Sequence, residues 1–260
     1  MPYECLQVRR AGPIEYLTLN RPDVRNAFND RVIEEFTDWA ARTAADATLR
    51  IVVLQGAGRV FSAGGDLAWM ARGAMLDGAG IRTEAGALHA MLLAIDRLPQ
   101  AVIGRIHGAA IAGGVGLVAV CDVAIAAEDT QFGFSEVTLG IVPAIISPFV
   151  VAKIGTSAAR ELFLTAARFT ALRARELGLV HRVVPSIGLD AAVDGCVAEL
   201  LSAAPGAVIA AKELLRELSG HRPDTAIDLT AEVIAERRLS VEGRAGVQSF
   251  LSKTAPPWTI

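Results

Sequence analysis

Two clusters of glycine, each following a short apolar run, constrain the fold of this chain more than any other feature. The run IVVLQG (51–56) precedes VFSAGGDL (60–67), and AVIGRI (101–106) precedes IAGGVGLVA (111–119). Apolar runs of this length are typical of buried strands. Because glycine has no side chain, each cluster lets bare backbone approach a neighbour or a ligand closely. The pattern predicts an α/β fold in which glycine-rich turns follow buried strands.

Helical periodicity alternates with these strands. Apolar residues recur at helical spacing from Asp30, with Asn29 as the N-cap, and again over residues 84–98. The segments PIEYLTLN (13–20) and VAIAA (123–127) predict further strands. We therefore expect strand, strand and helix to recur as a unit.

Helices dominate the last part of the chain. The segment TALRARELG predicts a helix from an N-cap at Thr170 to a C-terminal Gly178. No linker of low complexity interrupts the sequence. We predict a catalytic core over residues 1–186 and a helical C-terminal region over residues 187–260.

The composition narrows the functional classes. Of 260 residues, 52% are hydrophobic, enough for a substantial core, and the net charge is −3 without a block of Lys and Arg. These values disfavour nucleic acid as a partner. Three cysteines without metal-ligand spacing favour reduced thiols, and no basic-apolar leader or charge-free run of membrane-spanning length is present. We expect a cytoplasmic protein that binds no membrane.

The second glycine cluster also fits a dinucleotide-binding fingerprint. Gly114, Gly116 and Ala119 match G-x-G-x-x-G/A, and Glu136 lies 20 residues beyond Gly116. The context argues against this interpretation, because the helix after Gly113 must end before VAIAA and Glu136 lies in the polar segment QFGFSEV. Another alternative is that the small residues only permit close helix packing.

The presence of two clusters favours a third interpretation. Two loops that each aim a backbone N–H into one cavity form an oxyanion hole, whose donors lie where negative charge develops. A helix that opens at Gly113 and Gly114 adds its positive end to the same field. The pair therefore indicates enolate chemistry.

Six segments together carry a family resemblance. They are LNRPDVRNAF (19–28), GRVFSAGGDL (58–67), HGAAIAGGVGLVAVCD (107–122), QFGFSEVTLGIVP (131–143), LTAARFTALRARELGLVHRVVP (164–185) and EGRAGVQSFLSK (242–253). In this order and spacing they resemble the crotonase family of acyl-CoA enzymes, also called the enoyl-CoA hydratase/isomerase family. The resemblance implies a spiral of strand-strand-helix units with a helical C-terminal trimerisation region. It also implies an acyl-CoA substrate, no metal, no cofactor other than the coenzyme A of the substrate, and a homotrimer or homohexamer.

The resemblance also assigns roles to single residues. The backbone N–H groups of Gly65 and Gly113 match the oxyanion hole, and Glu136 matches a proton-carrying acid. Further positions match the surface that binds the acyl-CoA: Arg25, Ala27, Ala63, Gly64, Asp66, Leu67, Ile111, Gly114, Gly116, Phe250 and Lys253. The last two match a helix that reaches the CoA of a neighbouring subunit in relatives. An ordinary exposed amphipathic helix is the alternative for these two residues. For Asp66, a structural hydrogen-bonding role in the turn is favoured over a proton-carrying one.

The sequence departs from the two-glutamate pattern of the best-known hydratases. The first glutamate position is Gly116, so only the second, Glu136, is kept. Burial in an apolar pocket would raise the pKa of Glu136, which suits a group that accepts and donates protons near neutral pH. A purely structural role is the alternative for Glu136.

Three functions follow from a single acid. The leading one is hydration of a 2-enoyl-CoA, since the segment 113–155 resembles a bacterial branch assigned to branched substrates such as methylglutaconyl-CoA. In that branch AIISP (144–148) replaces the more usual glycine-rich loop. The second is isomerisation, because Glu136 and an oxyanion hole suffice to move a proton between C2 and C4 of an enoyl thioester. The third is acyl-CoA binding without catalysis. An NAD(P)-binding protein is a remote fourth.

The acyl chain is not determined by the sequence. It depends on where the side chains of four candidate wall residues point: Trp69, Met70, Phe134 and Ile145. Glu84 and His89, on the predicted helix over 84–98, are further candidates for the pocket. The apolar stripe of that helix explains it without them.

Overall fold

A computed structural model describes residues 3–73 and 75–259. The chain forms two compact units, Met1–Leu98 with Val102–Val193, and Pro99–Ala101 with Asp194–Ile260. The predicted division after residue 186 differs from the observed one after Val193, inside helix α7 (Leu189–Ser202). The first turn of α7 belongs to the first unit because Leu189 is buried and Asp190 forms an ion pair with Arg105 at 2.5 Å.

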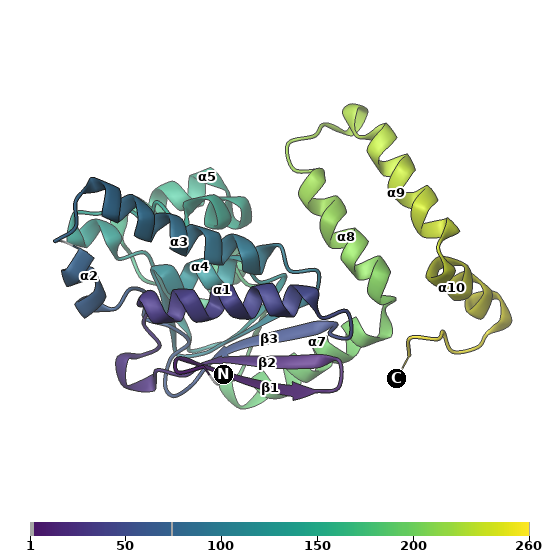
Figure 1. Ribbon diagram of the computed structural model, residues 1–260, viewed down its shortest axis with the longest axis horizontal. Coiled ribbons are helices and arrows are strands. Elements are labelled where there is room, and N and C mark those ends of the chain that lie inside the picture. Colours follow the sequence, from purple (N-terminus) through teal and green to yellow (C-terminus); the bar gives the residue numbers. More distant parts are fainter. Residues whose placement is uncertain (1–2, 74, 260) are drawn as a thin grey trace. The chain divides into compact units, whose positions relative to one another are not determined.

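The first unit contains two sheets, and Figure 1 labels strands β1, β2 and β3 of the larger one. A six-stranded sheet has the order β1-β2-β3-β4-β6-β9, and a three-stranded sheet has the order β5-β7-β8. The strands are β1 (Leu6–Ala11), β2 (Ile14–Leu19), β3 (Ile51–Gly56), β4 (Ala101–Ile106), β5 (Ala109–Ile111), β6 (Val123–Ala127), β7 (Gln131–Gly133), β8 (Phe169–Thr170) and β9 (Arg182–Val184).

The predicted strand-strand-helix repeat is present in the chain. The strands β4 and β5 lead into helix α4 (Gly113–Ala119). The strands β6 and β7 lead into the 3-10 helix η2 (Glu136–Leu139) and helix α5 (Ser147–Thr165). Since β4 pairs parallel with β6, and β5 with β7, successive turns of the chain stack on one another. The α/β class and the repeat are thereby confirmed.

Two amphipathic helices, α1 (Asp30–Ala45) and α3 (Gly78–Asp96), lie side by side (Figure 1). The side chain of Asn29 caps α1 by accepting a hydrogen bond from the N–H of Val32 at 3.0 Å, as predicted. The predicted apolar stripe of α3 is buried: Leu88, Met91, Leu92 and Ile95. This helix begins six residues before the predicted start at 84, because Asp77 accepts from the N–H of Gly80 as its cap.

The exposed strand β1 and the short strands β5, β7 and β8 are absent from the prediction, whereas the short strand predicted in LVHRVV (179–184) is present as β9. Strand β1 buries only its first residue, so it has no apolar periodicity. Its start is held instead by the buried carboxylate of Glu35, which accepts from the N–H groups of Glu4, Cys5 and Leu6 at 2.8–3.1 Å. Strands β5 and β7 have three residues each, too few for a pattern. The polar segment QFGFSEV, for which no strand was predicted, supplies β7.

The remaining helices include α2 (Leu67–Gly73) and α6 (Ala171–Glu176). Thr170 caps α6 as predicted, accepting from the N–H of Arg173 at 3.2 Å. The second unit holds most of α7 and the helices α8 (Pro205–Glu217), α9 (Ile227–Leu239) and α10 (Val241–Ser252). Short 3-10 helices complete the chain: η1 (Pro22–Val24), η3 (Ser186–Gly188) and η4 (Pro223–Thr225).

In the described ranges, no single helix is long and apolar enough to cross a membrane. One pair, residues 186–202 and 205–217, reaches that length and composition only when joined across a bend of 102°.

Candidate active site

Three neighbouring parallel segments end at one place in the first unit. Ser62 forms a parallel bridge with Ala110 of β5, and β5 pairs parallel with β7 so that Ile111 lies opposite Gly133. The chain therefore runs in the same direction through all three segments. In open α/β sheets, ligands bind beyond the carboxyl ends of parallel strands. Beyond these ends lie Gly65, Gly113 and Glu136, the three residues predicted to be catalytic.

The N–H of Gly65 is presented by a short pairing with residue 28. The N–H of Phe28 donates to the carbonyl of Gly64 at 2.7 Å, and the N–H of Asp66 donates to the carbonyl of Phe28 at 2.8 Å. This parallel bridge uses the residues on either side of Gly65. The N–H of Gly65 itself takes no part in the pairing.

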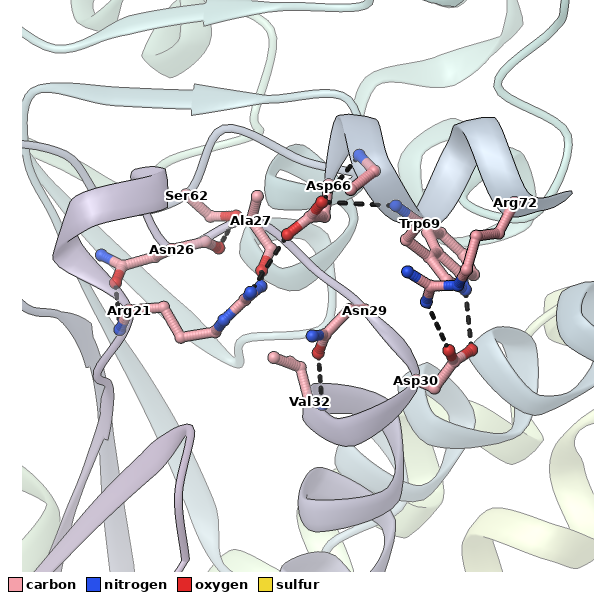
Figure 2. A network of polar contacts seen from close by, with 11 residues as sticks. Arg21, Asn26, Ala27, Asn29, Asp30, Val32, Ser62, Asp66, Trp69 and Arg72 are labelled. Atoms are coloured by element: carbon pink, nitrogen blue, oxygen red, sulfur yellow. Dashed lines mark hydrogen bonds and ion pairs between the residues drawn. The ribbon is translucent and has the colours of Figure 1, made fainter.

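A buried polar network supports this first glycine loop (Figure 2). The hydroxyl of Ser62 donates to the carbonyl of Asn26 at 2.9 Å and accepts from the N–H of Gly64 at 3.2 Å. The amide of Asn26 donates to the carbonyls of Ala57 and Val60 at 2.8 and 2.9 Å. Asn26 and Ser62 are both fully buried. Since each polar group is paired, the network fixes the loop in one conformation.

An ion pair between Arg21 and Asp66 closes the loop on its other side (Figure 2). The guanidinium of Arg21 donates to the Asp66 carboxylate at 3.0 Å and to the carbonyl of Ala27 at 2.5 Å. The other carboxylate oxygen accepts from the N–H groups of Ala68 and Trp69 at the start of α2. Partial burial would raise the pKa of Asp66, but these hydrogen bonds outweigh it and hold that pKa below its ordinary value. Asp66 is therefore fully engaged as a charged structural group.

The second loop presents the N–H of Gly113. Gly113 is the first residue of α4, and the first N–H groups of a helix have no acceptor within it. The preceding Ala112 has φ 50° and ψ −119°, a conformation costly for a residue with a side chain. Its N–H donates to the carbonyl of Gly133 at 2.9 Å, which ties α4 to the end of β7.

Gly64 lets the two loops touch. It has φ +87°, and a Cβ there would lie 2.7 Å from the carbonyl oxygen of Ile111 and 2.9 Å from the Cβ of Ala112. It would also lie 3.3 Å from the backbone nitrogen of Gly113. Only glycine fits both the conformation and the space. The amides of Gly65 and Gly113 are thus carried by loops in direct contact.

Glu136 is the first residue of η2, three positions beyond the end of β7. Within the described part of the chain, its Oε2 is buried and has no hydrogen-bond partner. Burial raises the pKa of Glu136 above its ordinary value, and its own backbone N–H opposes the rise. A carboxyl group in these surroundings is poised to exchange a proton with a bound molecule.

The predicted binding residues of the first unit surround these loops. Arg25 is exposed and has φ 54°, and its carbonyl accepts from the N–H of Ala63 at 2.9 Å. Leu67 is 78% exposed at the start of α2, whereas Ala27, Ile111 and Gly114 are buried. Gly116 is buried in α4.

Phe250 and Lys253 lie in the second unit, at the end of α10. Phe250 is 83% exposed, and Lys253 is exposed with φ 54°. Their predicted contact with the CoA of a neighbouring subunit stays a prediction.

The candidate wall residues divide into two groups. Phe134 is buried in the core, where its ring packs against those of Phe163 and Phe169. The sulfur of Met70, by contrast, would lie 3.2 Å from a Cβ at Gly65, and the indole N–H of Trp69 donates to Asp30 at 2.7 Å (Figure 2).

The two other acid-base candidates lie on α3. His89 packs on the ring of Phe149, with 5.4 Å between ring centres. A carboxylate oxygen of Glu84 would lie 3.3 Å from a Cβ at Gly73 of α2. No three His, Cys, Asp or Glu side chains of residues 3–73 and 75–259 come together in a group that could hold a metal ion.

Sequence reasoning missed the residues that hold the loops. Arg21 and Asn26 lie within LNRPDVRNAF, which carried the resemblance. Arg21 bonds to Asp66, 45 residues away, and Asn26 bonds to Ala57, 31 residues away, so only the fold brings these pairs together. Ile146, which packs against Gly116, was missed for the same reason.

Residues 9–260 match the model of the enoyl-CoA hydratase/isomerase family. The chain belongs to this family. It shares 32% identity over 259 residues with the 2,3-dehydroadipyl-CoA hydratase of Escherichia coli, covering 96% of this chain and 97% of that protein.

Solved structures extend the family likeness to the fold. An enoyl-CoA hydratase from Shewanella pealeana superposes with a TM-score of 0.94 at 36% identity, covering 98% of this chain and 96% of the other. Pseudomonas aeruginosa AtuE gives 0.95 at 37% identity, covering 99% and 100%. As a member of this family, the protein is an enoyl-CoA hydratase/isomerase enzyme that acts on acyl-CoA thioesters.

Proposed function

We propose that the protein hydrates a 2-enoyl-CoA with Glu136 as its only acid-base group. One observation carries the proposal. In the described part of the chain, the Oε2 of Glu136 is buried without a hydrogen-bond partner, just beyond the end of β7. The neighbouring parallel strand, β5, leads directly to the N–H of Gly113. A raised pKa allows the same carboxyl group to accept and return a proton.

In the proposed reaction the ionised Glu136 takes a proton from water as the oxygen of that water bonds to C3. The electrons of the C2–C3 double bond move toward the thioester, whose oxygen becomes negatively charged. The N–H groups of Gly65 and Gly113 stabilise that oxygen, because fixed donors need no reorganisation as the charge develops. Glu136 then gives the proton to C2. One water is added across the double bond, and the carboxylate is restored.

Isomerisation is the second candidate, and the glycine at position 116 favours it. Position 116 has no side chain and Asp66 is engaged with Arg21, so among the described residues of the two loops and η2 the proposed proton carrier is Glu136. One acid is enough to take a proton from C2 of a 3-enoyl-CoA and return it at C4. The enolate and its two backbone donors are the same in both reactions.

The first glycine loop and the Arg25 turn form the proposed binding surface for coenzyme A. The exposed guanidinium of Arg25 is suited to bind a phosphate of coenzyme A. The exposed side chain of Leu67 is suited to contact the apolar part of the pantetheine arm of coenzyme A. No metal or nucleotide cofactor enters the proposed reaction.

The proposal is tested with a panel of straight, branched and dicarboxylic 2-enoyl- and 3-enoyl-CoAs, with products identified by mass spectrometry. The name of the Escherichia coli relative motivates the dicarboxylic member. Hydration that survives dialysis against a chelator supports the proposal, and calorimetry should show binding of acetoacetyl-CoA and none of NADH. Tight binding of acetoacetyl-CoA without turnover of any member would favour a non-catalytic acyl-CoA-binding protein.

We also propose assembly as a homotrimer or homohexamer in the cytoplasm. The second unit exposes large apolar side chains that an interface would cover: Leu215, Val241, Val247, Phe250 and Leu251. The three cysteines are buried, and their odd number without metal-ligand spacing suits a reducing compartment. Light scattering that reports a stable monomer at micromolar concentration would contradict the assembly, and cell fractionation tests the location.

A further inference from the structure

A side chain at position 116 would point toward the oxyanion end of α4. Position 116 is one turn after Gly113, so both lie on the same face of the helix. The Cα–Cβ bonds of a helix tilt toward its N-terminus. A carboxylate at position 116 would therefore reach back toward the N–H of Gly113.

The space into which that side chain would extend is already filled. A Cβ on Gly116 would lie 2.5 Å from Cγ2 and 3.1 Å from Cβ of Ile146, and 3.5 Å from Cδ1 of Leu92. A distance of 2.5 Å is far shorter than any contact between two carbon atoms. Ile146 is 3% exposed and Leu92 is fully buried. Neither side chain offers a polar atom, so this wall holds no water by hydrogen bonding.

Ile146 has little freedom to move aside. It precedes α5, its carbonyl accepts from the N–H of Val150 at 3.0 Å, and the next residue but one is Pro148. Its Cγ2 branches directly from Cβ, and β-branched side chains are stiff about χ1. The clash would therefore involve atoms close to the backbone of Ile146, and not the far end of a flexible side chain.

We infer that Ile146 is a specificity-determining residue that keeps the pocket a one-acid site. Its Cγ2 methyl excludes a second acid, and the water that such an acid would hold, from the Gly116 side. The outcome of the reaction is thereby left to Glu136 and to groups that the substrate brings. This inference rests on the proposed function, because it concerns how water is positioned in the same pocket.

The steric part is tested by placing Gly116→Ala in three backgrounds: wild type, Ile146→Val and Ile146→Ala. Valine keeps the Cγ2 methyl and alanine removes it, so the two form a matched pair. We expect Gly116→Ala to lower Tm by roughly 5 °C in the wild-type and valine backgrounds and by clearly less in the alanine background.

The chemical part is tested by Gly116→Glu with Ile146→Ala, against Gly116→Gln with Ile146→Ala as a control of equal size. We expect the glutamate to raise hydration of crotonyl-CoA, relative to isomerisation of a 3-enoyl-CoA, by at least about tenfold over the glutamine. The same glutamate with Ile146→Val should give no such rise.

Equal Tm losses in all three backgrounds would overturn the inference, and so would equal product ratios for the folded glutamate and glutamine variants. The Tm cycle, in which Gly116→Ala is placed in the three backgrounds, adds only a methyl group at position 116. It therefore decides the steric part even if a glutamate variant does not fold. Failure of the proposed function looks different, because wild type would then have no turnover, or turnover independent of Glu136, while the Tm cycle still reports on Ile146.

Discussion

The two glycine loops carry equivalent backbone donors but are held by different forces. The first loop is anchored by polar groups: the Arg21–Asp66 ion pair and the buried hydroxyl of Ser62. The second is anchored by the start of a helix, by one backbone hydrogen bond from Ala112, and by close packing of small residues. The two amides that must act on one oxygen are thus held in different ways. The first loop is the charge-dependent half of the site, and the second loop is the shape-dependent half.

Because the two loops are held by different forces, different changes to the protein should disturb each of them. Changes of charge and pH act on the first loop through its carboxylate, whereas changes of volume act on the second. The halves meet at Gly64, whose missing Cβ lets them touch. Position 64 should therefore be the most sensitive position of the two loops.

Among the changes to the glycine loops, Gly64→Ala should have the largest effect. The new Cβ clashes with the Ile111 carbonyl and the Ala112 side chain, so it pushes the loops apart and misplaces a donor. Loss of one oxyanion donor costs about 10²–10³ in rate, and we expect kcat/KM to fall by that factor. Gly12→Ala is the matched control, because Gly12 has φ +59° but nothing within 4 Å of a Cβ. Equal activity of the two variants would contradict the role given to Gly64.

Lowering the pH should separate the two halves. The raised pKa of Glu136 means that its carboxylate, the base in the reaction, is lost as pH falls through a value above its ordinary one. Asp66, with its lowered pKa, keeps its charge and its stabilising contribution until pH falls further, through a value below its ordinary one. We expect kcat/KM to fall about tenfold per pH unit on the acid limb, while circular dichroism reports a folded protein. Unfolding that coincides with the activity loss would refute this order.

Asp66→Asn tests the charge-dependent half alone. It removes the ion pair with Arg21 but keeps an oxygen for the N–H groups at the start of α2. A hydrogen bond to a charged group contributes about 1.5–3 kcal/mol, and solvent around this partly buried pair reduces that contribution. If the remainder, about 1.4 kcal/mol, is lost from the positioning of the Gly65 N–H, kcat/KM should fall about tenfold. Arg72→Met, which breaks an exposed pair with Asp30, is the control and should change little. Equal losses in the two variants would show that the Arg21–Asp66 pair has no special role.

Gly65→Ala should have the smallest effect. Its Cβ would meet the sulfur of Met70 at 3.2 Å, and methionine readily adopts another rotamer. The backbone N–H is retained, so we expect kcat/KM within about threefold of wild type. A loss as large as that of Gly64→Ala would contradict this expectation. It would mean that an added methyl group at these glycines lowers kcat/KM by clashing with the acyl chain, and not by breaking the contact between the loops.

Local pattern was enough to predict helices α1, α3, α4 and α6 and the glycine loops. The stripe that includes Leu88 and Ile95, and the cap at Asn29, follow from helical spacing and capping chemistry within one segment. Contacts across long separations were not predictable in this way. The packing of Ile146 on Gly116 joins positions 30 residues apart, and the burial of Phe134 depends on two rings from later segments.

Glu136→Gln tests the lone-acid role of Glu136 most directly, since glutamine keeps the size and shape of the side chain but cannot carry a proton between substrate atoms. The measurement is kcat for hydration of crotonyl-CoA and for isomerisation of a 3-enoyl-CoA, beside the calorimetric affinity for acetoacetyl-CoA. We predict that both rates fall by about 10²–10⁴ while the affinity and the fold are preserved. Unchanged rates in the folded variant would contradict the account, and the proton carrier would then have to be sought at Glu84 or His89.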